Sequence, residues 1–77
     1  MTLTREQVSI LDHTLRRASV PGHYCGGGPD MDVLVAAGLM ESAGRVSWVP
    51  DEYFRIRPAG KAFLRTAEAR QILEGAL

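Results

Sequence analysis

Apolar residues in the first part of the chain recur at helical spacing. They are three or four positions apart and form one stripe, made of Val8, Leu11, Leu15 and Ala18. This period predicts an amphipathic helix over residues 4–18. Thr4 and Gln7 have the spacing of a capping box at its start, and Leu3 with Val8 has that of a hydrophobic staple.

The next segment, residues 19–29, contains four glycines and predicts a loop. Pro29 is suited to the first turn of a second helix, and the carboxylates of Asp30 and Asp32 are favourable near its N-terminus. Gly38 is the expected stop. The apolar side of this helix is expected to comprise Met31, Leu34, Val35 and Leu39.

The period then changes to alternation, which predicts a β-hairpin with strands at residues 45–49 and 53–57 and a turn at 50–52. Phe54 and Ile56 should share one face of the second strand. The opposite face should carry Tyr53, Arg55 and Arg57. A last helix should begin at Pro58, with an apolar face of Ala62, Phe63, Thr66, Ala69 and Leu73, and fray beyond about residue 68.

Composition places these elements in one α+β domain spanning residues 1–77. Apolar residues make up 45% of the chain and charged residues 23%, which is typical of a globular protein. Nine basic residues balance nine acidic ones, which argues against a dedicated electrostatic binder of nucleic acid or anionic membrane. The polar start and short apolar runs favour a cytoplasmic protein that does not span a membrane.

Candidate chemistry is sparse, and we expect neither enzyme activity nor a cofactor. Gly26–Gly28 precede a helix but lack the Lys-Ser/Thr pair of a phosphate-binding loop. His23 and Cys25, with His13 and Asp30 elsewhere, could be read as metal ligands, or the His-Cys pair as a nucleophile and its base. Zinc sites usually contain several cysteines, so a surface or half-buried Cys25 in a loop is the favoured interpretation and no metal site is expected.

The second half of the chain resembles a winged-helix domain. The resemblance rests on residues 34–40, which read LVAAGLM, and residues 53–64, which read YFRIRPAGKAFL and resemble the return strand of a wing. It implies a small winged-helix-like fold of helix, Gly-rich loop, helix, β-hairpin and C-terminal helix. The chain departs from the family in having a Gly-rich loop in place of a middle helix, and Arg57 where a Thr is frequent.

The whole chain also resembles short phage and prophage proteins, through residues 3–4, 28–29, 34–40 and 54–62. This resemblance implies a non-enzymatic accessory module that binds a host protein complex, for example an anti-CRISPR-like inhibitor. The alternative is a winged-helix transcriptional regulator that binds DNA. Against that alternative, residues 30–37 begin with two carboxylates and contain no side chain that could donate to base edges or phosphates.

Arginines and aromatic residues near the hairpin and the first helix are the candidate partner-binding residues, because both types are enriched in protein-binding hot spots. They are Arg16, Arg17, Arg45, Trp48, Tyr53, Arg55 and Arg57. The arginines could instead be solvated or paired with Asp51, Glu52 and Glu68, and the two aromatic residues could be core or cross-strand partners. The last helix also carries apolar surface that a homodimer could cover, at Ile72, Leu73 and Leu77.

Overall fold

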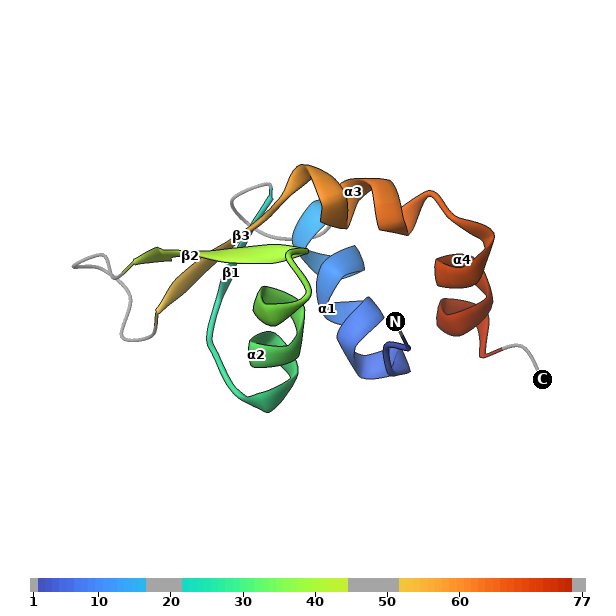
Figure 1. Ribbon diagram of the computed structural model, residues 1–77, viewed down its shortest axis with the longest axis horizontal. Helices are drawn as coiled ribbons and strands as arrows, with labels where there is room; N and C mark the ends of the chain where they lie inside the picture. Colours follow the sequence, from blue (N-terminus) through green and yellow to red (C-terminus); the bar gives the residue numbers. More distant parts are fainter. Residues whose placement is uncertain (1, 17–21, 45–51, 76–77) are drawn as a thin grey trace.

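The computed structural model describes residues 2–16, 22–44 and 52–75, which form four helices and a three-stranded antiparallel sheet (Figure 1). The order along the chain is α1 (Arg5–Arg16), β1 (His23–Cys25), α2 (Pro29–Ala36), β2 (Met40–Gly44), β3 (Tyr53–Ile56), α3 (Pro58–Leu64) and α4 (Ala67–Glu74). The α+β class expected from the hydrophobic pattern is therefore confirmed.

The start of α1 has the predicted capping box. Gln7 N–H donates to Thr4 Oγ1 at 3.2 Å, and Thr4 N–H donates to Gln7 Oε1 at 2.9 Å. Two donors that the helix itself cannot satisfy thus gain partners. Leu3 and Val8, the predicted staple pair, are both buried. Residues 17 and 18 of the expected helix lie outside the described residues.

The sheet has the strand order β1-β3-β2, so the central strand is the last one in the chain. Tyr24 pairs with Phe54 on one side of β3, and Ser42 pairs with Phe54 on the other. The prediction of a loop throughout residues 19–29 is wrong at His23–Cys25. Backbone pairing with β3 forms this strand, although the neighbouring glycines are typical of a loop.

The hairpin is confirmed as an antiparallel pair of β2 and β3, but its first strand begins earlier than predicted. The ladder starts at Met40, opposite Ile56, and has an irregularity between Ser42 and Gly44. Apolar alternation at residues 45–49 had suggested the later position. Those residues and the turn at 50–51 lie outside the described part of the chain.

The predicted stop of the second helix at Gly38 is confirmed. α2 finishes at Ala36 and Ala37 caps it, while Gly38 follows with a φ of +77°, a left-handed conformation that favours glycine. Leu39 is buried, but it lies beyond the helix whose apolar side it was expected to join.

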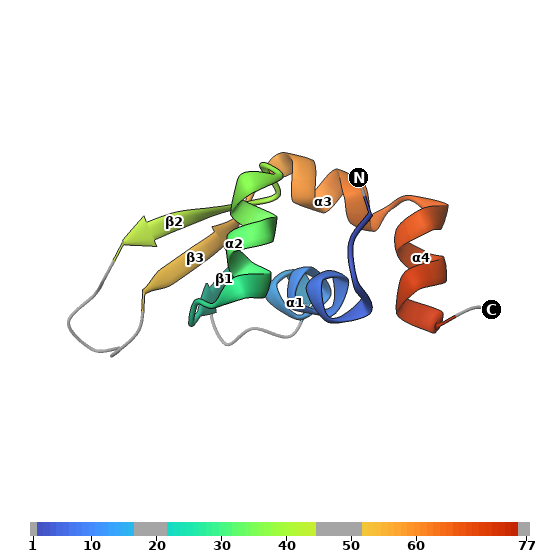
Figure 2. The ribbon, with the colours of Figure 1, turned by 60° about the horizontal axis from the view of Figure 1, so that its bottom comes forward.

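The last helical segment is two helices rather than one. α3 ends at Leu64, and α4 begins after Thr66, whose Oγ1 accepts a hydrogen bond from Ala69 N–H at 3.1 Å. Thr66 was expected on an apolar helix face, but it is the N-cap of α4. The stretch beyond residue 68, where fraying was expected, is helical to Glu74. α4 lies at the end of the molecule away from the sheet, beside α1 (Figures 1 and 2).

Gly60 marks a close contact between α3 and the segment between α2 and β2. A Cβ atom at this position would lie 2.4 Å from the Leu39 carbonyl oxygen and 2.8 Å from Ile56 Cγ1. The same Leu39 oxygen accepts a hydrogen bond from Arg57 N–H at 2.9 Å. The absence of a side chain therefore allows α3 to begin directly against the end of the sheet.

The core lies between the helices and one face of the sheet. α1 and α2 cover this face, and Tyr24 on it contacts the His13 ring of α1 edge-on, with the ring centroids 5.9 Å apart. The buried apolar residues are Leu3, Val8, Leu11, Met31, Leu34, Leu39, Met40, Phe54, Ile56, Leu64 and Ala69. The opposite face of the sheet is directed away from α1 and α2.

Candidate functional site

The sheet face directed away from α1 and α2 carries three of the predicted partner-binding residues. Phe54 and Ile56 of β3 are buried, so the alternation of the strand places Tyr53 and Arg55 on the opposite face. Arg57 follows at the end of β3, as predicted from the same period. We call the surface formed by His23, Cys25, Glu41, Tyr53, Arg55 and Arg57 the outer sheet face.

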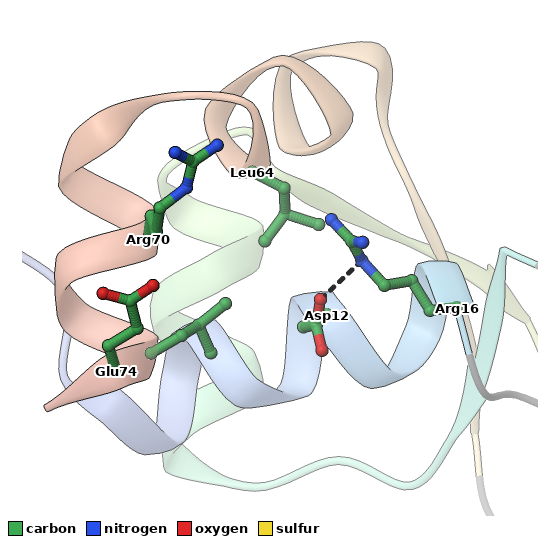
Figure 3. A pocket seen from close by; sticks show the side chains of 6 residues that line it. Asp12, Arg16, Leu64, Arg70 and Glu74 are labelled. Carbon is green, nitrogen blue, oxygen red and sulfur yellow. Dashed lines mark ion pairs between the residues drawn. The ribbon is translucent and has the colours of Figure 1, made fainter.

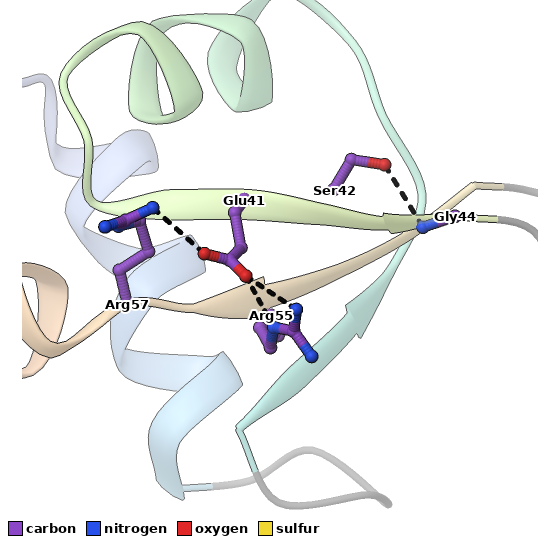
Figure 4. Close-up of polar contacts among 5 residues, drawn as sticks. All are labelled: Glu41, Ser42, Gly44, Arg55 and Arg57. Carbon is purple, nitrogen blue, oxygen red and sulfur yellow. Dashed lines mark hydrogen bonds and ion pairs between the residues drawn. The ribbon is translucent and has the colours of Figure 1, made fainter.

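Glu41 of β2 joins the two arginines of this face (Figure 4). Its Oε2 atom accepts from Arg55 Nε and is 2.7 Å from both Arg55 Nε and Arg55 Nη2. Its Oε1 atom accepts from Arg57 Nη1 at 3.0 Å. The register places Glu41 opposite Arg55 across the ladder, so the sheet itself brings the three side chains together.

This arrangement stabilises the charged form of Glu41. The hydrogen bond from Arg55 is the largest effect and lowers the pKa of the carboxyl group below its ordinary value. Desolvation is the next largest and opposes it, and the positive charges of Arg55 and then Arg57 lower the pKa further. The contacts to Arg55 and Arg57 therefore favour the ionised form of Glu41.

The pairing partner of the arginines differs from those expected. Asp51, Glu52 and Glu68 were the proposed partners, but the described partner of Arg55 and Arg57 is Glu41. Glu52 instead accepts a hydrogen bond from the Ser42 hydroxyl. Sequence reasoning missed Glu41 because it lies in a strand predicted to begin several residues later.

Aromatic rings lie beside this charged cluster. The rings of His23 and Tyr53 are stacked, with centroids 5.3 Å apart and an interplanar angle of 21°. His23 is opposite Arg55 in the ladder, and Cys25 is opposite Tyr53. Tyr53 is therefore a cross-strand partner at the surface, which agrees with one of its two predicted roles, and Cys25 is exposed.

Arg16 has a different setting from Arg55 and Arg57. Its Nε atom is 2.7 Å from Asp12 Oδ1, one turn earlier on α1. Figure 3 shows this pair at a shallow groove of about 280 Å³. The groove is lined by Asp12, Arg16, Leu64, Arg70, Leu73 and Glu74. The structure thus places the predicted binding residues in at least two locations.

Other predicted binding residues lie outside the described part of the chain, namely Arg17, Arg45 and Trp48. Their role in partner binding remains a prediction. For the expected homodimer, Ile72 and Leu73 pack partly buried against the core, which leaves less apolar surface than the helix pattern suggested. Leu77 is also outside the described residues, and the dimer remains a prediction.

The exposed side of α2 is mainly apolar. Val33 is 42% exposed and Val35 38% exposed, and Asp32 lies on the same exposed side. Asp30, at the start of the helix, accepts a hydrogen bond from Gln7 Nε2 at 3.2 Å and so connects α2 to α1. This helix presents carboxylates and methyl groups, but no hydrogen-bond donor from a side chain.

Potential metal ligands do not gather in residues 2–16, 22–44 and 52–75, where no three His, Cys, Asp or Glu side chains are grouped to hold an ion. In the same ranges, every helix is too short or too polar to cross a bilayer. Comparisons with models of protein families, with curated proteins and with solved structures found no match to this chain.

Proposed function

We propose that the chain is a non-enzymatic protein-binding module that acts by occupying a surface of a host complex, in the manner of short phage accessory proteins such as anti-CRISPR inhibitors. The observation that carries this proposal is the exposed side of α2. Val33 and Val35 present methyl groups to solvent on a helix that is otherwise well packed through Met31 and Leu34. Val33 and Val35 are two positions apart, so they flank the exposed side of the helix, with Asp32 between them. A partner protein packed over this side could bury both valines, whereas a nucleic-acid backbone would gain nothing from them.

Side-chain chemistry also favours a protein partner over a duplex. A helix that reads the major groove needs Arg, Lys, Asn, Gln, Ser or Thr to reach base edges. α2 has none of these, and its first turn carries Asp30 and Asp32, which would repel phosphates. The net charge of zero agrees with the same interpretation.

A pull-down from nuclease-treated host lysate tests this function. The tagged chain should capture a protein, and the purified captured protein should bind it again in a two-component titration. The double substitution Val33→Lys and Val35→Lys should weaken that binding by about tenfold or more, because it places charge in an apolar contact. The double substitution Ala62→Lys and Ala67→Lys, at exposed positions of α3 and α4, adds the same charge as a matched control and should bind like the original chain.

A winged-helix DNA-binding regulator is the second candidate, favoured by one observation. The β2–β3 hairpin follows α2, and a hairpin after a helix is the arrangement that the resemblance implies for a wing. In the described residues a single helix, α2, lies between α1 and this hairpin, where the family has two. Retention on DNA with a steep salt dependence, and no protein partner, would replace the first proposal with this one.

A further inference from the structure

The outer sheet face combines exposed cations with a fixed geometry. The side chains of Arg55 and Arg57 are 52% and 49% exposed, although both form ion pairs. α1 and α2 lie against the other side of the sheet, where Phe54 and Ile56 are buried. The two guanidinium groups are therefore accessible to a partner.

The charges on this face do not balance. Among its described residues, Arg55 and Arg57 carry two positive charges and Glu41 one negative charge. Each guanidinium has five N–H groups in a planar fork. Glu41 takes the Nε and Nη2 edge of Arg55 but meets only Nη1 of Arg57, so most donors of Arg57 remain available to a second carboxylate.

Glu41 also determines how these donors are presented. By holding both side chains, it reduces the conformational freedom that a partner would otherwise have to remove on binding. A bidentate carboxylate–guanidinium contact is the strongest interaction that such donors can make with a protein. The His23–Tyr53 ring stack adds a flat apolar surface next to the cations.

We propose that the outer sheet face docks an acidic segment of the partner protein, with a partner carboxylate bound by Arg57 and Arg55 beside Glu41. This inference rests on the proposed protein-binding function and names the chemistry of its partner. A nucleic-acid strand fits less well, because its phosphates form a continuous chain of negative charge that would pass over the carboxylate of Glu41.

Fluorescence anisotropy with a short labelled peptide of alternating Asp and Ser tests this directly. The double variant R55Q/R57Q should bind the peptide about tenfold or more weakly, because it removes charge-assisted hydrogen bonds. The matched control K61Q/R65Q removes the same charge from exposed positions of α3 and its C-cap, and it should bind like the original chain.

Unchanged binding in R55Q/R57Q, or an equal loss in K61Q/R65Q, would overturn the inference. Tighter binding of a labelled oligothymidylate with the same number of negative charges would overturn it in favour of nucleic acid. Circular dichroism and thermal melting should show that all variants fold, because exposed ion pairs contribute little to stability.

The captured partner separates this inference from the function on which it rests. If R55Q/R57Q binds the purified partner as well as the original chain does, the sheet-face inference fails and the protein-binding function stands. If the original chain captures no protein at all, the proposed function itself fails.

Discussion

Gly60→Ala should destabilise the fold through a clash that no flexible side chain can relieve. The added Cβ would be 2.4 Å from the Leu39 carbonyl oxygen, whereas ordinary contacts begin at 3.4 Å. The two atoms must therefore separate by about 1 Å to reach ordinary contact. The Leu39 carbonyl group cannot move away freely, because two backbone hydrogen bonds hold this residue. Leu39 N–H donates to Leu34 O at 3.0 Å, and Leu39 O accepts from Arg57 N–H.

The magnitude follows from three contributions. Overpacking costs roughly 1–3 kcal/mol, and weakening the Arg57–Leu39 hydrogen bond costs about 0.5–1.5 kcal/mol more. The higher helix propensity of alanine at this position offsets up to about 1 kcal/mol. We therefore expect Gly60→Ala to lower the free energy of unfolding by about 2–3 kcal/mol, which is a large fraction of the stability of a domain this small.

Urea and thermal unfolding followed by circular dichroism measure this effect. The expected loss corresponds to a decrease in Tm of roughly 8–24 °C for a domain of this size. Gly27→Ala is the matched control, because a Cβ there would meet Phe54 only at an ordinary distance of 3.7 Å and Gly27 has no left-handed φ. A Gly60→Ala variant with the midpoint of the original chain would refute the close-contact argument.

Three further experiments test local features. Thr4→Ala removes the capping hydroxyl of α1 and should lower the free energy of unfolding in urea by about 0.5–2 kcal/mol, whereas Thr4→Ser should retain most of that stability. Equal urea midpoints for the original chain and both variants would contradict the capping role of Thr4. Thr66→Ala should cost about 1 kcal/mol and speed amide exchange in α4 more than in α1, so uniform exchange would contradict its local role. Arg55→Gln should raise the pKa of Glu41 more than Arg57→Gln does, as measured by carbon NMR titration, because the Arg55 hydrogen bond is the largest cause of the lowered pKa. Because folding lowers the pKa of Glu41, the contribution of its arginine contacts to stability should be present above about pH 4.5 and be lost as the pH falls through the lowered pKa. A Glu41 titration that neither variant changes would contradict the assigned cause of the lowered pKa.

Local signals in the sequence predict the local features of this fold well. The Thr4–Gln7 capping box is confirmed because its spacing alone brings the side chains to the backbone donors. The alternation of β3 is confirmed because burial of Phe54 and Ile56 determines which face the arginines take. Gly60 lies in the segment 53–64, and its close approach to the Leu39 carbonyl oxygen is a physical reason for glycine at this position.

Contacts between segments that are distant in the sequence could not be predicted from such local signals. β1 is a strand because β3 offers it hydrogen-bond partners, and nothing in the composition of residues 22–28 indicates this. Glu41 meets Arg55 only because of the register of β2 on β3, and a hairpin predicted several residues later hides that contact. Thr66 separates α3 from α4 because its hydroxyl competes for backbone partners, which the apolar period does not reveal.

The position of β3 at the centre of the sheet has a consequence for the order of folding. Arg55 must meet Glu41 across a short stretch of chain, but it must meet His23 across a stretch more than twice as long. Each doubling of such a loop costs about 0.6 kcal/mol of closure entropy. We therefore expect the hairpin to form early and β1 to dock late, so that substitutions in β1 accelerate unfolding while those in β2 slow folding.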